Sequence, residues 1–589
     1  MKSNINHISI ANLKAESPEG LEPIVGQIRE FLISSISETG GHIGANLGVV
    51  ELSVALHYAF NSPNDAFIFD TGHIGYTHKV LTGRAEMFKT LNTYGGMNRF
   101  ISRDESVHDF IEASHAGTSI SIALGRALAL RNAGKEDWTV AIIGDGALSE
   151  GIALEALNHA SVEPNIRLLI VINDNGYAIS PGFGAIHNYL QSRKTGSTES
   201  DSLFSSLGYK VLGPIDGHSI KALLAAFDEV KTSFEVCVIH LKTEKGKGLI
   251  SAANHPFKMH FSFPFEAETG VSLWPPVGVT YQDVASSAIN KCMEHDSKIV
   301  AITPSTLYAT GLASIFEKYP TRCFDPGMEE QHAVSMAVGM ALAGLRPILF
   351  YQSTFLQRAF DQLIHDVSFS NQDILILTVR SGFAGYDNPT HHGIYDFSYL
   401  RCLPNVQIFY PKDAQELYTI TSIALTTLKG PLIIHMPYGS ISDPGDLRTD
   451  LTMNVHEPDL ITSGRDGVII TIGNKVASCL SAIELLESRG LSFGLINIRQ
   501  LKPLQENYLL PLLKNVERVV TVEEGVLEGG FGSAISSFMH KNELDQELLQ
   551  IGLPCAFIEA GSNDELSSKY GLDSNGIVGQ ILARWRPTI

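Results

Sequence analysis

Short apolar runs and longer stretches of helical periodicity alternate along most of the chain. Residues 140–143, 168–172 and 236–239 are unbroken runs of apolar side chains. Such runs are typical of strands that are buried on both faces of a parallel sheet. Apolar residues at three- and four-residue spacing over 21–32 predict an amphipathic helix. The pattern therefore predicts an α/β fold with mainly parallel sheets.

Two irregular stretches divide this pattern into three parts. Residues 263–283 are interrupted by Pro264, Pro275 and Pro276, and residues 440–466 contain Asp443-Pro444-Gly445. Domain boundaries commonly fall in such segments. We predict α/β domains at 1–262, 284–445 and 446–589, joined by a linker at 263–283. We expect strands at 299–302, 347–351, 374–379, 406–410 and 432–435 in the second domain, and at 468–472, 493–498, 519–522 and 556–558 in the third.

Charge and composition narrow the classes of partner. The chain has 63 acidic and 43 basic side chains, which gives a formal net charge of −20 at pH 7. This excess disfavours nucleic acids and anionic membranes as partners, because both are polyanions. No apolar run approaches the ~18 residues of a transmembrane helix, and the N-terminus has no apolar signal segment. We therefore expect a cytoplasmic protein whose six scattered cysteines are free thiols.

Candidate chemistry begins at the ends of two predicted strands. Gly144-Asp145-Gly146-Ala147 follows the run 140–143, and Asn173-Asp174-Asn175-Gly176 follows the run 168–172, with a predicted helix at 150–160 between them. In α/β folds, strand carboxyl ends and helix amino termini bind phosphates, because free amides and the helix dipole face the ligand there. Asp145 and Asn175 are hard oxygen ligands, which Mg²⁺ prefers. The paired motifs predict a magnesium–phosphate site.

This pair of motifs resembles the thiamine-diphosphate signature of the transketolase superfamily. The resemblance implies that Asp145, Asn175 and the Tyr177 carbonyl oxygen hold Mg²⁺. It also implies that Glu330 bonds the pyrimidine ring of the cofactor and that Phe355 stacks on it. A ring nitrogen that must gain a proton needs a partly desolvated carboxyl beside it, which favours a functional over a structural role for Glu330.

Further motifs occur in order along nearly the whole chain and are similar to those of the 1-deoxy-D-xylulose-5-phosphate synthase family. They are Gly41-His42, Asn46-Leu47-Gly48, Thr71-Gly72-His73, residues 78–84, His115-Ala116-Gly117-Thr118, residues 213–218, Thr390-His391-His392-Gly393, residues 398–402 and Glu523-Glu524-Gly525. The resemblance implies a homodimeric transferase that decarboxylates pyruvate on thiamine diphosphate and joins the two-carbon unit to an aldehyde or sugar.

The resemblance also implies which residues form the site. The cofactor is expected to contact His73, Ser114, His115, Ala116, Gly146, Ala147, Asn175, Lys245, Glu330 and Phe355. The substrates are expected to lie among His42, His115, His260, His391, Asp387 and Arg380. Near-neutral imidazoles suit carboligation, because that reaction moves protons to and from hydroxyl and carbonyl oxygens.

The chain departs from the family where the acceptor phosphate is normally held. The family uses two arginines and a tyrosine. Arg380 supplies the first arginine, but Gln352 stands in place of the tyrosine and Tyr438 in place of the second arginine. A tyrosine cannot make the bidentate, charge-assisted contact of an arginine. We therefore predict an altered pocket for an acceptor that is unphosphorylated or differently charged.

Smaller departures accompany this one. Ala116-Gly117 replaces a pair of serines, Leu249 replaces a tyrosine, and the segment 191–202 is shorter than is typical of the family. Three alternatives remain open at the level of the sequence. They are ketol transfer of the transketolase type, a non-catalytic cofactor-binding paralogue, and a component of a 2-oxoacid dehydrogenase complex.

Overall fold

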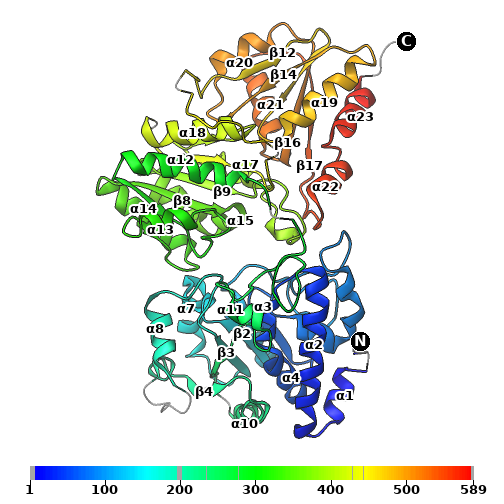
Figure 1. Cartoon of the computed structure of the whole chain (residues 1–589), viewed down its shortest axis with the longest axis vertical. Helices are drawn as coiled ribbons and strands as arrows, with labels where there is room; N and C mark the ends of the chain where they lie inside the picture. Colours follow the sequence, from blue (N-terminus) through cyan, green and yellow to red (C-terminus); the bar gives the residue numbers. More distant parts are fainter. Residues whose placement is uncertain are drawn as a thin grey trace. The chain divides into compact units, whose positions relative to one another are not determined.

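The computed structural model describes residues 5, 7–194, 202–233, 235–275, 277–427, 429–441, 443–450 and 452–585. These residues form two units, one of residues 1–276 with 327–329 and one of residues 277–326 with 330–589. Residues 195–201, which make up most of the short segment 191–202 noted in the sequence, lie outside the described residues. Figure 1 shows the elements of each unit in sequence colours.

The first unit is built on a five-stranded sheet in the order β1-β2-β3-β5-β4, in which every neighbouring pair is parallel. Its strands are β1 (Ala66–Phe69), β2 (Thr139–Gly144), β3 (Leu168–Asp174), β4 (Lys210–Asp216) and β5 (Cys237–Lys242). Its α-helices are α1 (Ile10–Ala15), α2 (Leu21–Thr39), α3 (Ile43–Leu47), α4 (Val50–Ala59), α5 (Tyr76–Lys79), α6 (Ser119–Asn132), α7 (Gly151–Ala160), α8 (Gly184–Ser192), α9 (Leu203–Ser206), α10 (Ile220–Lys231) and α11 (Ile250–Asn254).

Alternate residues of the central strands enter different cores. Val140 and Ile142 of β2 pack in one apolar cluster, whereas Ala141 and Ile143 pack in another. Because successive side chains of a strand point to opposite faces, this division places a core on each face of the sheet. The unbroken apolar run in the sequence is explained by burial on both faces, as predicted.

The second unit contains two sheets. The larger, of seven strands, has the order β15-β10-β11-β9-β8-β6-β7, and the smaller, of five strands, has the order β12-β14-β13-β16-β17. The larger sheet contains β6 (Ile299–Ile302), β7 (Cys323–Phe324), β8 (Arg346–Gln352), β9 (Leu375–Val379), β10 (Gln407–Phe409), β11 (Leu432–His435) and β15 (Gln500–Lys502). The smaller contains β12 (Asp459–Thr462), β13 (Gly467–Thr471), β14 (Phe493–Asn497), β16 (Arg518–Val526) and β17 (Glu547–Leu553). Only β12 and β15 pair antiparallel with their neighbours among these strands.

The helices of this unit surround both sheets (Figure 1). They are α12 (Tyr281–His295), α13 (Ala313–Lys318), α14 (Glu330–Leu342), α15 (Ser353–Leu356), α16 (Phe360–Gln362), α17 (Asp396–Leu400), α18 (Ala414–Thr426), α19 (Lys475–Glu487), α20 (Glu506–Leu513), α21 (Phe531–Lys541), α22 (Asn563–Lys569) and α23 (Ser574–Arg584). The two sheets share one apolar core, in which Leu349 of β8 and Ile470 of β13 both lie. In addition β15, from the C-terminal segment, pairs with β10 of the larger sheet.

The predicted fold class is confirmed, and one predicted strand is wrong. Residues 556–558 are not a strand; the last strand of the smaller sheet is β17, at Glu547–Leu553. This edge strand is only partly buried over most of its length and carries polar side chains such as Gln550. An edge strand needs no continuous apolar run, so the pattern used for prediction did not detect it. Among the helices of the described residues, none combines the length and the apolar character needed to cross a membrane.

Candidate active site

Two turns at the carboxyl edge of the first sheet are joined by side-chain hydrogen bonds. Asp145 follows β2, and its Oδ2 accepts a hydrogen bond of 3.0 Å from the backbone amide of Gly176. Asn175 follows β3, and its Oδ1 accepts one of 3.0 Å from the amide of Tyr177. The second oxygen of Asp145, Oδ1, is buried and has no hydrogen-bond partner. Such an oxygen is costly to bury unless a cation or a donor meets it.

Asp145 differs from the neighbouring Asp174 in what surrounds it. Asp174 accepts hydrogen bonds from His240 Nε2 at 2.8 Å and Lys242 Nζ at 2.5 Å, so its charge is balanced within the protein. Burial and, secondly, the charge of Asp174 raise the pKa of Asp145 to about 7. The open oxygen of Asp145 beside the Asn175 turn therefore fits a bound Mg²⁺.

This candidate magnesium site has a single carboxylate. No cluster of three or more His, Cys, Asp or Glu side chains suited to a metal occurs among the described residues. A site with so few protein ligands requires oxygens from elsewhere, as when Mg²⁺ bridges a protein to substrate phosphates. The donor set at Asp145 and Asn175 is therefore consistent with a metal that arrives with a phosphorylated cofactor.

Lys245 lies beside the same turn. Its Nζ donates a hydrogen bond of 2.6 Å to the Ala178 carbonyl oxygen and lies 3.1 Å from His260 Nδ1. Burial lowers the pKa of Lys245 to about 7, and the charge of Asp145 opposes this shift. A phosphate at this position would favour the cationic form of the amine, because an opposite charge nearby stabilises a buried ion.

His42, His73 and His260 form one cluster. The ring centroids of His42 and His73 are 5.4 Å apart, those of His42 and His260 are 5.5 Å apart, and those of His73 and His260 are 5.2 Å apart. Burial lowers the pKa of His73 to about 3 and that of His260 well below its ordinary value. The two rings are therefore neutral at pH 7 and can each donate and accept a hydrogen bond.

Asn46 holds two of these histidines in place. Its buried Nδ2 donates hydrogen bonds of 2.7 Å to the carbonyl oxygens of both His42 and His73. The loop that carries His260 is attached to the same region, because Gly41 and Ser262 exchange two backbone hydrogen bonds of 2.9 Å. Three predicted site residues from distant parts of the sequence are thereby brought together.

The predicted residues Ser114, His115 and Ala116 lie in a loop that is anchored to the end of β1. Asp70 accepts hydrogen bonds from the backbone amides of Gly117, at 2.8 Å, and Ser119, at 3.1 Å. Gly117 has φ = +88°, and a Cβ added there would lie 2.4 Å from Glu150 Oε2. A serine at position 117, as in the family pattern, would therefore be strained in this backbone.

In the second unit, Glu330 begins helix α14 and is buried. Its carbonyl oxygen accepts a hydrogen bond of 2.9 Å from the Tyr351 hydroxyl, and its Oε2 lies 3.9 Å from Arg358 NH1. Phe355 and His391 pack edge to face, with ring centroids 5.6 Å apart. The structure thus brings Phe355 and His391 together, and it fixes Glu330 at a helix start.

Arg380, Asp387 and Tyr438 form a compact group. The Arg380 guanidinium pairs with the Asp387 carboxylate and lies 4.9 Å from the centroid of the Tyr438 ring. Gln352, at the end of β8, is buried, whereas Tyr351 points to the opposite face and into the core. As expected from strand alternation, Tyr351 does not replace the missing tyrosine at position 352.

Models of known protein families match successive parts of this chain. The family model described as 1-deoxy-D-xylulose-5-phosphate synthase matches residues 4–202 and 191–243. Models for the transketolase pyrimidine-binding domain and the transketolase C-terminal domain match residues 277–442 and 458–577. A 1-deoxy-D-xylulose-5-phosphate synthase of Halothermothrix orenii is 38% identical over 97% of this chain and 95% of its own. That of Listeria monocytogenes is 40% identical over 95% and 94%. The chain belongs to this family.

Membership of the 1-deoxy-D-xylulose-5-phosphate synthase family confirms the predicted resemblance and enzyme class. The chain is a transferase of the type that joins pyruvate to an aldehyde with thiamine diphosphate. A solved transketolase of Pichia stipitis aligns over 97% of this chain and 98% of its own, with 16% identity and a TM-score of 0.46.

Sequence patterns did not single out the residues that hold the family's site residues in position. Asn46 and Asp70 bind backbone groups of the site loops, and Tyr351 binds the backbone of Glu330. Asn46 lies within a family motif, which is a signal of importance but not of its role. Apart from the His42 carbonyl oxygen, which is four residues from Asn46, the targets of all three are backbone atoms far away in the sequence, so only the folded chain reveals them.

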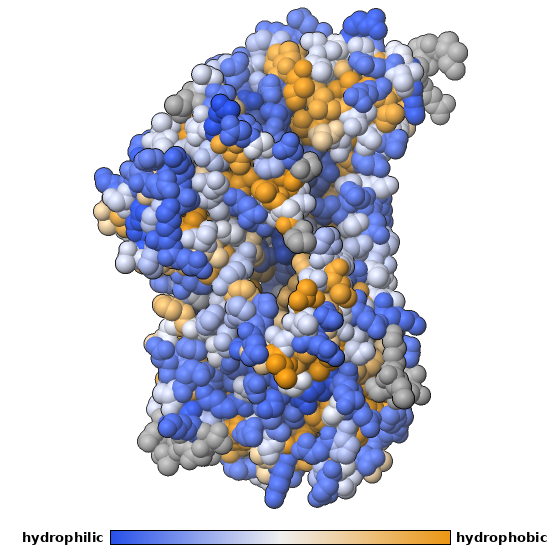
Figure 2. Space-filling view, in the orientation of Figure 1, coloured by the Kyte–Doolittle hydropathy of each residue, from blue (hydrophilic) through white to orange (hydrophobic). Residues whose placement is uncertain are grey.

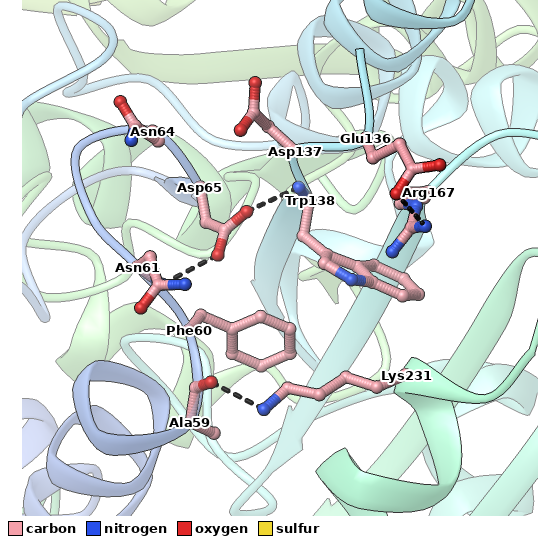
Figure 3. Close-up of a pocket in the computed structure, with 10 residues that line it drawn as sticks. All are labelled: Ala59, Phe60, Asn61, Asn64, Asp65, Glu136, Asp137, Trp138, Arg167 and Lys231. Carbon is pink, nitrogen blue, oxygen red and sulfur yellow. Dashed lines mark hydrogen bonds and ion pairs between the residues drawn. The ribbon is translucent and has the colours of Figure 1, made fainter.

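A cavity of about 380 Å³ lies elsewhere in the first unit (Figure 3). It lies where β1, β2 and β3 begin, at the edge opposite to Asp145. Two of its charged groups are already used within the protein: Asp65 accepts from the amides of Asn61 and Trp138, and Lys231 donates to the Ala59 carbonyl oxygen. This cavity is therefore not the candidate site.

Proposed function

We propose that the chain binds thiamine diphosphate with Mg²⁺, decarboxylates pyruvate and transfers the two-carbon unit to an aldehyde. The observation that carries the proposal is the buried, unpartnered Oδ1 of Asp145 beside the Asn175 turn, in a chain of this family. When bound, thiamine diphosphate supplies a nucleophilic ring carbon and an electron sink for the decarboxylation.

The first unit would hold the diphosphate end of the cofactor. Asp145 Oδ1, Asn175 and the Tyr177 carbonyl oxygen would bind Mg²⁺, and Lys245 would bind a phosphate oxygen. Gly146 and Ala147 begin the helical segment that follows Asp145, where backbone amides suit an anion. Ser114, His115 and Ala116, in the loop anchored by Asp70, would complete the cofactor contacts.

Proton transfer would fall to buried polar side chains. Glu330 would hold a proton against the pyrimidine ring, with Phe355 stacked on that ring. The neutral imidazole of His260 and the imidazole of His42 would donate hydrogen bonds to substrate oxygens and accept hydrogen bonds from substrate hydroxyls. His115 and His391 would act in the same way toward the substrates. The neutral imidazole of His73 would contact the cofactor.

The acceptor would carry no phosphate dianion. Arg380 is the single arginine left of the family's pair, its charge is balanced by Asp387, and the Tyr438 ring covers it. Gln352 offers an amide in place of a phenol. A neutral hydroxyaldehyde can hydrogen-bond to this group, whereas a dianion would face the Asp387 carboxylate.

The test is product identification with ¹³C-labelled pyruvate, Mg²⁺ and thiamine diphosphate. D-glyceraldehyde and D-glyceraldehyde 3-phosphate serve as matched acceptors. We expect labelled CO₂ and a carboligation product, with the higher kcat/KM for D-glyceraldehyde. Strong preference for the phosphate ester would contradict the altered acceptor pocket but not the carboligase activity. Turnover of ketose phosphates without CO₂ release would instead identify a transketolase, and binding without any turnover a non-catalytic paralogue.

Oligomeric state, domain limits and location are further parts of the proposal. We propose a homodimer, supported by the exposed apolar side chains Val271, Leu273 and Trp274, which are 63%, 65% and 52% accessible. Figure 2 shows apolar surface gathered in separate clusters on the face displayed. Sedimentation at several concentrations tests the dimer. The domains at 1–262, 284–445 and 446–589 and the cytoplasmic location remain predictions.

A further inference from the structure

The loop of residues 381–393 carries much of the proposed acceptor site. It follows Arg380 at the end of β9 and contains Asp387 and His391. Arg380 itself has φ = +67°, so the chain leaves the strand through a backbone conformation that side chains rarely adopt. Such a conformation persists only when surrounding contacts hold it, so other parts of the chain must hold this loop.

Glu524 of β16, in the smaller sheet, contacts the backbone of this loop. Its Oε1 accepts a hydrogen bond of 2.8 Å from the backbone amide of Phe383. Gly382 makes this approach possible, because a Cβ added there would lie 2.3 Å from the same oxygen. The carboxylate is therefore in direct contact with two successive residues of the loop.

The position of Glu524 is itself fixed by buried groups. Its Oε2 accepts hydrogen bonds from Lys475 Nζ at 2.5 Å and from Asn474 Nδ2 at 3.1 Å. Both Glu524 and Lys475 are buried, at 4% and 5% accessibility. A buried ion pair that is fully hydrogen-bonded holds one geometry, because breaking it would leave an uncompensated charge.

Other contacts join the same loop to the C-terminal segment. His392 Nδ1 accepts from the Ala384 amide at 2.9 Å, and its Nε2 donates to the Glu559 carbonyl oxygen at 3.0 Å. The Tyr386 hydroxyl donates to Glu565 Oε2 at 2.5 Å. The chain around the smaller sheet thus binds the loop at several successive positions.

The same segment also reaches the residue that covers Arg380. Asn563 Nδ2 donates a hydrogen bond of 3.1 Å to the Tyr438 carbonyl oxygen. The group formed by Arg380, Asp387 and Tyr438 is therefore attached to C-terminal residues in two ways. One attachment is through the loop that carries Asp387, and the other is through Tyr438.

We propose that the smaller sheet and its C-terminal segment position the acceptor site, with Glu524 as the principal positioning residue. This inference rests on the proposed function, because it assumes that the aldehyde acceptor binds at Arg380, Asp387 and His391. It gives the C-terminal segment a specific role in binding one of the two substrates.

The test compares Glu524→Gln with Glu523→Gln. Glu523 is the adjacent residue of β16, is equally buried, and also accepts two hydrogen bonds, both of 2.7 Å, from the amides of Phe531 and Gly532. It therefore matches Glu524 in type, strand and burial but binds the start of α21 and not the loop. In Glu524→Gln, the amide NH₂ must face either the Phe383 amide or Lys475 and Asn474, which are all donors.

Hydrogen–deuterium exchange of the full-length protein gives a readout that does not depend on activity. We expect faster exchange in peptides that cover 381–387 for Glu524→Gln and unchanged exchange there for Glu523→Gln. Tyr386→Phe, which removes one half-buried hydroxyl, provides a second variant that preserves the fold. It should loosen the same peptides by a smaller amount. Unchanged exchange in both loop variants would overturn the proposal.

Steady-state kinetics then tests the role of the loop. With whichever of D-glyceraldehyde and D-glyceraldehyde 3-phosphate the unsubstituted protein uses, we expect Glu524→Gln to raise the acceptor KM roughly 10- to 100-fold. The pyruvate KM should change less than about twofold, because the proposal assigns the acceptor and not the donor to the position that Glu524 holds. An equal change in both KM values, or none, would overturn the positioning role. Absence of turnover in the unsubstituted protein would refute the proposed function, while the exchange result would still decide whether Glu524 holds the loop.

Discussion

The Tyr351 hydroxyl donates a hydrogen bond of 2.9 Å to the carbonyl oxygen of Glu330, the residue proposed to activate the cofactor. Burial raises the pKa of Tyr351 well above its ordinary value, so the hydroxyl remains a donor at any pH at which the protein functions. The contact links the end of β8 to the first residue of α14 and fixes the backbone from which the Glu330 side chain projects.

Tyr351→Phe should weaken this arrangement without emptying the core. Loss of one buried hydrogen bond costs about 0.5–1.5 kcal/mol in the free energy of unfolding. We expect in addition a reduced kcat, because Glu330 loses a constraint on its position. Thermal unfolding and steady-state kinetics measure the two effects. Tyr209→Phe is the matched control, since its buried hydroxyl donates to the Leu157 carbonyl oxygen at 2.5 Å. The control should lose stability but retain kcat; a similar loss of kcat in both variants would contradict the positioning role of Tyr351.

Glu330→Gln should abolish most turnover while leaving the fold intact. General acid–base groups commonly contribute about 100- to 10,000-fold to rate, and we expect a loss in this range. The glutamine is nearly isosteric, so the thermal midpoint should change little. Glu329→Gln, at the preceding position, serves as control and should retain activity. Turnover by Glu330→Gln at the unsubstituted rate would exclude Glu330 as the activating acid.

Tyr438→Arg should restore recognition of a phosphate. A second guanidinium near Arg380 would add a charge-assisted contact of about 1.5–3 kcal/mol, which corresponds to roughly a tenfold or greater fall in KM for D-glyceraldehyde 3-phosphate. Tyr438→Phe retains the aromatic ring over Arg380 without adding charge and should show no such gain. If both variants prefer the same acceptor as the unsubstituted protein, Tyr438 does not determine acceptor specificity.

Gly44→Ala should displace the loop that carries His260. A Cβ at position 44 would lie 1.7 Å from the Lys258 carbonyl oxygen, and the Gly44 amide already donates to the Met259 carbonyl oxygen at 3.0 Å. Overpacking of this kind typically costs about 1–3 kcal/mol. We expect a lower thermal midpoint and weaker cofactor binding, measured by calorimetry. Gly26→Ala, in an open position of α2, should instead stabilise the protein by about 0.5–1 kcal/mol.

Asp396→Asn should change how stability depends on pH. Burial raises the pKa of Asp396 to about 7, against an ordinary value of 3.8. Between these values the native state binds a proton that the unfolded chain has released, so Asp396 lowers stability as pH rises through this window. Of the groups that face it, Tyr399 and Tyr410 stay neutral in the native and the unfolded state over this window. Burial lowers the pKa of His435 to about 3, so His435 contributes a slope of the opposite sign below its ordinary value of 6.5; this contribution cancels when the variant and the unsubstituted protein are compared at each pH.

The measurement is the thermal midpoint from pH 4.5 to 8. Asp396→Asn should match the unsubstituted protein at the acidic end and become progressively more stable relative to it as pH rises. Asp109→Asn is the control with the opposite sign, because hydrogen bonds from His78 and Arg84 hold the pKa of Asp109 below its ordinary value. Asp109→Asn should have a lower thermal midpoint than the unsubstituted protein throughout this range, and the difference between the two midpoints should not change with pH. A constant difference for Asp396→Asn as well would show that Asp396 titrates normally.

Much of the fold follows from local sequence patterns. The run at 168–172 became β3, and the predicted helix at 150–160 became α7, because burial on both faces and helical periodicity are both visible along the chain. The strand predicted at 556–558 was wrong, since the true edge strand β17 is partly exposed and carries no comparable signal. The motif residues of the candidate site could be named by resemblance, but their contacts could not.

By itself, the sequence determined the α/β class, the family and the departure at Gln352 and Tyr438. These are properties of residue type and local order. Only the tertiary structure decided that Tyr438 covers Arg380, that Asn46 joins His42 to His73, and that Glu524 holds Phe383 from more than a hundred positions away. Each of these contacts pairs a side chain with a distant ring or backbone group, and such pairing depends on how the chain folds back on itself rather than on which residues are neighbours in sequence.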